Sequence, residues 1–162
     1  PLPPSSAASD VYKRQRYNPP HVVLDPVMVA TSGDVLIEQG CISALQEQLV
    51  PLASVITPNI PEAEILAEQT FFDLEQMASS LLRAGAKAVL LKGGHLEGED
   101  SMDVIRSADF SEVLSAPRIQ TNNTHGTGCT LSSALACFLA KGEDLHHAAR
   151  LAKDYLLSLI HI

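Results

Sequence analysis

Ala88-Val89-Leu90-Leu91-Lys92-Gly93-Gly94 is a run of four apolar residues that ends at a lysine and two glycines. A short apolar run bounded by turn residues is typical of a strand buried on both faces. A similar pattern occurs twice earlier, in residues 21–24, which end at Asp25-Pro26, and in residues 54–57, which end at Pro58-Asn59. The sequence therefore predicts three buried strands, each followed by polar or turn-forming residues.

Segments with helical periodicity alternate with these strands. Pro61-Glu62 predicts a helix start, because proline suits the first helical position and an acid suits the first turn. Two shorter antiparallel strands are expected at residues 103–105 and 113–116. The other predicted helices follow Gly40 up to Pro51 and cover residues 73–83, 127–140 and 145–156. Apolar strands that alternate with helices indicate an α/β fold, with a mostly parallel sheet and helices on both faces.

Such a sheet binds ligands beyond the carboxyl ends of its strands. We therefore expect Asp25, residues 57–59 and residues 92–94 to lie along one rim of the sheet.

Thr124-His125-Gly126-Thr127-Gly128-Cys129-Thr130 places two glycines in a turn that leads into a helix. The first N–H groups of a helix have no intrahelical partner and attract anions, so this turn predicts a phosphate pocket. Cys129 falls in the first helical turn, where the pKa of a thiol is expected to drop. The alternative is a glycine-rich helix start that packs on the sheet and carries an inert thiol.

The composition of the chain excludes some classes of function. The chain has 162 residues, 46% of them hydrophobic, and a formal net charge of −8, which argues for one globular domain and against nucleic-acid binding. No apolar run is long enough to cross a membrane. Three cysteines without C-x-x-C spacing fit a reducing compartment, so we expect a cytoplasmic protein.

The two ends carry a shared signature. Asp10-Val11-Tyr12-Lys13-Arg14-Gln15 can be encoded by GATGTGTATAAGAGACAG, whose reverse complement encodes Leu157-Ser158-Leu159-Ile160-His161-Ile162. This element resembles the transposon end used in sequencing-library preparation. We therefore expect residues 1–15 and 157–162 to be non-native tails around a native segment at 16–156.

Several motifs together resemble hydroxymethylpyrimidine/phosphomethylpyrimidine kinase, a thiamin-pathway family of the ribokinase-like superfamily. The turn at 123–130 carries the resemblance most strongly. The other matching stretches are Val23-Leu24-Asp25-Pro26-Val27-Met28, Thr31-Ser32-Gly33-Asp34, Ile56-Thr57-Pro58-Asn59-Ile60-Pro61-Glu62-Ala63, Leu91-Lys92-Gly93-Gly94-His95 and Ala116-Pro117-Arg118. They correspond to roughly the second half of such an enzyme, so the resemblance implies an incomplete, C-terminal fragment of a ribokinase-like domain.

The resemblance implies an ATP- and Mg²⁺-dependent kinase. The γ-phosphoryl group of ATP would move to the hydroxymethyl group of a small pyrimidine, and a second one to the phosphate just formed. Cys129 would be the catalytic base, and Gly126, Thr127 and Gly128 would hold the transferring phosphoryl group.

The remaining site residues come from the strand ends. Asn59 and Glu62 resemble the superfamily's N-x-x-E element, which holds Mg²⁺ largely through water, and Asp25 is a third candidate for the metal. Lys92, Gly93 and Thr57 are candidates for nucleotide contact. Each also has a plain structural reading, as a helix-opening acid, a helix cap or a turn residue.

Two other functions stay open. A pyridoxal kinase of the cysteine-containing type shares every motif above. A nucleotide-binding domain without catalysis is disfavoured, because Gly126, Gly128 and Cys129 are all present. The resemblance implies a small-molecule substrate, with no nucleic-acid or membrane partner, and leaves open whether the full-length protein forms a homo-oligomer. The fragment itself is expected to be inactive.

Overall fold

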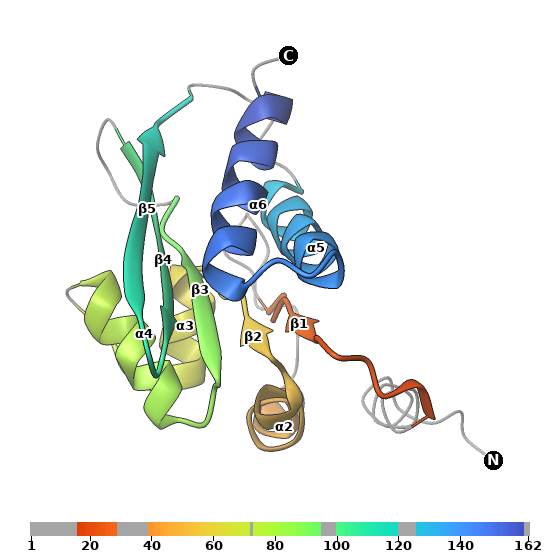
Figure 1. Cartoon of the computed structure of the whole chain (residues 1–162). Helices are drawn as coiled ribbons and strands as arrows, with labels where there is room; N and C mark the ends of the chain where they lie inside the picture. Colours follow the sequence, from red (N-terminus) through yellow and green to blue (C-terminus); the bar gives the residue numbers. More distant parts are fainter. Residues whose placement is uncertain (1–15, 29–38, 72, 95–99, 120–125, 161–162) are drawn as a thin grey trace.

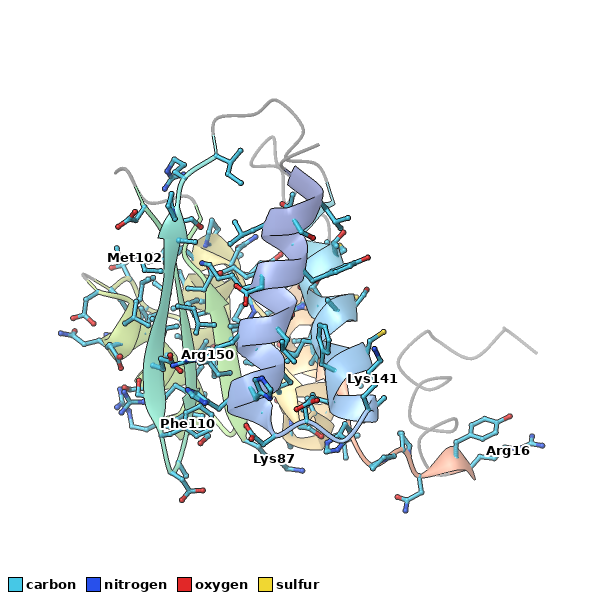
Figure 2. The ribbon with its side chains drawn as sticks, turned by 45° about the horizontal axis from the view of Figure 1, so that its top comes forward. Arg16, Lys87, Met102, Phe110, Lys141 and Arg150 are labelled. Carbon is cyan, nitrogen blue, oxygen red and sulfur yellow. The ribbon has the colours of Figure 1, made fainter. Side chains whose placement is uncertain are left out.

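The computed structural model describes residues 16–28, 39–71, 73–94, 100–119 and 126–160 (Figure 1). The expected tail at 1–15, residues 161–162 and the motif Thr31-Ser32-Gly33-Asp34 lie outside these ranges. Residues 16–21 are exposed, and Figure 2 shows Arg16 far from the sheet.

A five-stranded sheet with the order β1-β2-β3-β4-β5 forms the centre of the fold. The first three strands are parallel, and β4 and β5 extend the sheet as antiparallel strands, as the sequence predicts. The strands are β1 (Val23–Leu24), β2 (Val55–Ile56), β3 (Ala88–Lys92), β4 (Asp100–Ser107) and β5 (Ser111–Pro117).

The antiparallel strands are longer than expected, eight residues in β4 and seven in β5. Along β5, buried Leu114 and Ala116 alternate with exposed neighbours. An antiparallel strand with one face in water tolerates polar residues at every second position, so a search for continuous apolar runs finds only part of it.

Helices cover both faces of the sheet (Figure 1). One layer contains α2 (Gln39–Ala44), α3 (Ile60–Ala67) and α4 (Leu74–Arg83), and α2 continues into the short helical turns η1 (Leu45–Leu49) and η2 (Val50–Leu52). The other layer contains α5 (Thr127–Ala140) and α6 (Leu145–Ile160).

The side chains of β3 show how the two layers are built. Val89 and Leu91 pack in the core beneath α3 and α4, while Ala88 and Leu90 pack in the core beneath α5 and α6. Because successive strand residues point to opposite faces, one continuous apolar run supplies both cores.

The last helix runs past the expected boundary at residue 156 and continues through Ile160. Leu157, which the sequence assigns to the non-native tail, extends this helix and lines the cleft described below. No helix in the described ranges has both the length and the apolar character needed to span a bilayer.

Candidate active site

A cleft of about 480 Å³ opens where the carboxyl ends of the parallel strands meet the N-terminus of α5. It brings together eight of the ten residues that the sequence predicts for the site: Asp25, Asn59, Glu62, Lys92, Gly126, Thr127, Gly128 and Cys129. The expectation that the three strand ends share one rim is therefore confirmed. The topology accounts for this, since β1, β2 and β3 are parallel neighbours.

An ion pair between Asp25 and Lys92 links the ends of β1 and β3. Lys92 Nζ donates to Asp25 Oδ1 at 2.8 Å, and both side chains are only about 15% exposed. The backbone N–H of Lys92 donates to the carbonyl of Pro58 at 2.9 Å, which ties the end of β3 to the turn after β2. The pair therefore presents one negative and one positive group to the cleft from a fixed frame.

The turn before α5 has the form expected of an anion site. Gly126 is the N-cap of the helix with φ = 78°, a left-handed conformation that glycine adopts without strain. Gly126 itself has no side chain that could cap this N-terminus. A Cβ on Gly128 would lie 3.1 Å from Lys92 Nζ, so the absence of a side chain there leaves room for the ammonium group beside the turn.

Glu62 and Asn59 form a reciprocal capping box at the start of α3. Asn59 Oδ1 accepts from the backbone N–H of Glu62 at 2.9 Å, and Glu62 Oε2 accepts from the N–H of Asn59 at 2.9 Å. Glu62 Oε1 also accepts from the N–H of Met28. Burial raises the pKa of Glu62, and the hydrogen bond from Asn59 and the charge of Lys92 oppose that rise. Asn59 and Glu62 therefore have the structural role that the sequence also allows, as a helix cap and a helix-opening acid.

The same residues also fit a hydrated magnesium ion. Within the part of the chain that the structure describes, no three or more His, Cys, Asp or Glu side chains cluster closely enough to hold a metal. Mg²⁺ is commonly held by one or two carboxylates and retains several waters, so Asp25 and Glu62 at one cleft suit contact through water. Asn59 is less suited to a direct contact, since its oxygen already caps the helix.

The pKa of Cys129 differs from the sequence-based expectation. Position in the first turn of a helix predicts a lowered value, but partial burial raises the pKa of the thiol above 9.0, and the nearby Asp25 carboxylate raises it further through its charge and a hydrogen bond. Lys92 opposes this effect without cancelling it. The surroundings of Cys129 therefore favour the thiol, and desolvation contributes more to this than the Asp25 carboxylate.

Thr57 and Gly93 lie near the cleft without lining it. Thr57 is fully buried, and its hydroxyl contacts Asp25 Oδ1 at 3.1 Å. Gly93 is buried beneath β4, where a Cβ would come within 2.0 Å of the Met102 carbonyl oxygen. That these two residues contact nucleotide stays a prediction. Thr57 supports Asp25, and Gly93 allows close packing of β3 against β4.

Sequence reasoning missed a buried ion pair at the edge of the cleft. Lys153 on α6 donates to Asp103 Oδ2 at 2.9 Å and to the carbonyl oxygens of Ser101 and Leu114. Asp103 Oδ1 accepts from the backbone N–H of Gly93 at 2.9 Å. The pair therefore fixes the turn after Lys92 to the last helix.

Comparisons with known proteins agree with this site. A family model described as phosphomethylpyrimidine kinase matches residues 5–161. The hydroxymethylpyrimidine/phosphomethylpyrimidine kinase of Rhizobium meliloti is 47% identical over 142 residues, which cover 85% of this chain and 53% of that protein. The chain thus spans about half the length of this relative.

Two solved structures are similar in fold. A phosphomethylpyrimidine kinase from Clostridium difficile has a TM-score of 0.80 and 35% identity, covering 95% of this chain and 63% of that one. A pyridoxal kinase from Staphylococcus aureus in complex with AMP-PCP has a TM-score of 0.83 and 32% identity, covering 94% and 56%. With a family match over almost the whole length and a cleft that gathers the expected residues, the chain belongs to the phosphomethylpyrimidine kinase family.

Proposed function

We propose that the protein containing this chain transfers the γ-phosphoryl group of ATP to 4-amino-5-hydroxymethyl-2-methylpyrimidine, and then a second one to the monophosphate, in thiamin biosynthesis. The observation that carries this proposal is the convergence of the glycine turn, Cys129 and the Asp25–Lys92 pair on one cleft. Since the chain covers about half of its relatives, the complete activity is assigned to the full-length protein.

The cleft supplies the two requirements of phosphoryl transfer, which are positioning and neutralisation of charge. Gly126, Thr127 and Gly128 would hold the transferring group at the helix N-terminus. Lys92 would contact the nucleotide phosphates. Mg²⁺, held through water by Asp25 and Glu62 with Asn59 as a supporting group, would neutralise phosphate charge when bound.

Cys129 is the proposed catalytic base. It lines the cleft beside the turn that would hold the transferring phosphoryl group. Its raised pKa does not prevent this role, because phosphoryl transfer needs little help from a base until late in the reaction.

We also propose the domain organisation and setting. Residues 16–156 would be the C-terminal part of one ribokinase-like domain, flanked by non-native tails at 1–15 and 157–162. The full-length protein would act in the cytoplasm on a small-molecule substrate.

A pyridoxal kinase remains the second candidate, supported by the TM-score of 0.83 to the Staphylococcus aureus enzyme. The chain is closer in sequence to the pyrimidine kinase of Rhizobium meliloti, at 47% against 32% identity. The protein encoded by the complete reading frame that contains residues 16–156 would distinguish the two activities when it is assayed with both substrates. We expect a higher kcat/KM for hydroxymethylpyrimidine than for pyridoxal, and the opposite order would favour the second candidate.

A chimera tests whether this chain carries the transfer machinery. Residues 16–156 replace the matching segment of the Rhizobium meliloti kinase, and the purified protein is assayed with ATP, Mg²⁺ and hydroxymethylpyrimidine. We expect phosphorylation at a rate within about tenfold of the parent kinase, since the catalytic residues are retained. A chimera that unfolds cooperatively on heating but forms no product would contradict the proposal.

A further inference from the structure

Two buried hydroxyl groups connect Asp25 to the glycine turn from below the cleft. Thr57 is 0% exposed and Ser132 is 6% exposed, and neither lines the cleft. Thr57 Oγ1 lies 3.1 Å from Asp25 Oδ1 and 2.8 Å from Ser132 Oγ. Ser132 Oγ in turn lies 3.0 Å from the carbonyl oxygen of Gly128. These contacts form a continuous chain from the rim of β1 to the first turn of α5.

The hydroxyl protons of Thr57 and Ser132 can point along this series of hydrogen bonds in either of two directions. Each hydroxyl carries one proton, and one of the two protons is used between Thr57 and Ser132. The other proton can then serve only one end of the chain. Either Thr57 donates, to Asp25 Oδ1 or to the carbonyl oxygen of Leu24 at 3.4 Å, or Ser132 donates to the carbonyl of Gly128. A charged carboxylate is the stronger acceptor, so the charge on Asp25 draws the chain toward itself.

The Gly128 end of the chain bears on the phosphate site. The carbonyl of Gly128 and the N–H of Cys129 belong to one planar peptide unit, in which the two groups point in opposite directions. When Ser132 instead donates to the Gly128 carbonyl, this hydrogen bond also favours one direction of the Cys129 N–H, so the hydrogen bonding at the Asp25 end affects the peptide at the phosphate site.

We propose that Thr57 and Ser132 are positioning residues that couple the Asp25 carboxylate to the Gly126–Cys129 turn through this chain of hydroxyl hydrogen bonds. The proposal rests on the proposed function, since it assigns these residues a part in the same transfer. They touch neither substrate nor nucleotide. Their effect is to link the carboxylate that pairs with Lys92 to the peptide that would hold the phosphoryl group, because only one of the two can accept the shared hydroxyl proton at a time.

Variants of the chimera test this coupling. Thr57→Val removes the hydroxyl at the centre of the chain and keeps the shape of the side chain, and Ser132→Ala removes only the second hydroxyl. We expect Thr57→Val to lower kcat about tenfold while the KM for ATP changes less than about threefold, because groups that act mainly in the transition state affect kcat. Thr57→Ser keeps the hydroxyl and should restore kcat to within about twofold.

The double variant Thr57→Val/Ser132→Ala distinguishes one continuous series of hydrogen bonds from two independent contacts. If the two hydroxyl groups act through one series of hydrogen bonds, the effects of removing them on kcat are not additive. The double variant should then lose about as much kcat as Thr57→Val alone. Ser133→Ala is the matched control, because Ser133 is an exposed neighbour on the same helix outside the cleft. Thermal unfolding checks that each variant is folded.

The proposal is overturned if the losses in the double variant multiply, if Thr57→Ser is as slow as Thr57→Val, or if folded Thr57→Val keeps its kcat. An inactive but folded chimera without substitutions would instead contradict the proposed function itself.

Discussion

At the scale of single residues, the surroundings of each cleft group set its protonation. The helix N-terminus favours a thiolate at Cys129, but burial and the Asp25 carboxylate favour the thiol and prevail. Glu62 is 2% exposed, and burial raises its pKa even though three nearby groups favour its charged form. Sequence position identifies such residues, while the balance of charges around them depends on the folded structure.

Replacement of Cys129 tests its proposed role as the base. In the chimera, Cys129→Ala should lower kcat by about 10²- to 10⁴-fold, the usual contribution of a general base, with a smaller change in the KM for ATP. Steady-state rates at saturating ATP provide the measurement. Cys137→Ala is a matched control, because Cys137 is exposed on the same helix and does not line the cleft. A Cys129→Ala rate within threefold of the parent chimera would exclude the role.

Replacement of Glu62 separates the effect of its charge on Mg²⁺ binding from its role in capping α3. Glu62→Gln keeps one oxygen that can accept the N–H of Asn59, so α3 should still form, although its NH2 group cannot accept the N–H of Met28. Loss of the carboxylate charge should raise the Mg²⁺ concentration for half-maximal activity by about tenfold or more. Glu64→Gln, on the same helix and outside the cleft, should leave this concentration unchanged. Superimposable Mg²⁺ titrations for Glu62→Gln and the parent chimera would leave Glu62 with its capping role alone.

Eight of the residues that the sequence predicts for the site line the cleft, whereas Thr57 and Gly93 lie beside it. Parallel strands bring their carboxyl ends to one rim, so position after a strand predicts nearness to the site. It does not predict the direction of the side chain. The buried Thr57 hydroxyl and the cleft-lining Lys92 ammonium both contact Asp25 Oδ1, and only the packing of the neighbouring strands decides which of these side chains also faces the cleft.

At the scale of elements, the existence and order of strands and helices follow from apolar runs and turn residues, whereas their lengths do not. The hairpin of β4 and β5 is longer than its apolar centre. Lys153 is a second case. It is 5% exposed among Ala149, Ala152 and Leu156 on α6, and the helical period alone could have shown a lysine in the apolar stripe. Its partner Asp103 lies on a distant strand, which the sequence does not reveal.

The packing of β3 against β4 predicts a steric role for Gly93. A Cβ at this position would meet the Met102 carbonyl oxygen at 2.0 Å, so Gly93→Ala should lower the free energy of unfolding of the chimera by about 1–3 kcal/mol or more. Gly40→Ala is the control, because no atom lies within 4 Å of a Cβ there. Chemical denaturation measures both. Equal stability of the two variants would show that the strand pair can relax around a side chain.

At the scale of the whole molecule, β1 is an edge strand of the described sheet and pairs with β2 alone among the residues that the structure covers. It consists of two half-buried apolar residues, Val23 and Leu24. An apolar edge promotes pairing with other chains. The chain spans 53% of the Rhizobium meliloti kinase.

We therefore expect the 162-residue chain, expressed alone, to be poorly soluble or molten and to lack kinase activity. Expression of residues 16–156, followed by thermal unfolding and an assay with ATP and hydroxymethylpyrimidine, tests this expectation. A cooperative transition together with turnover would show that this segment is sufficient.

We propose that the cleft at the Gly126–Cys129 turn transfers phosphoryl groups from ATP to a pyrimidine alcohol and then to its phosphate. Phosphorus NMR of the chimera with ATP, Mg²⁺ and hydroxymethylpyrimidine measures this most directly. We expect a monophosphate to form first and a diphosphate to follow, with one ADP released for each transfer. A folded chimera that releases ADP and inorganic phosphate, with no phosphorylated pyrimidine, would contradict it.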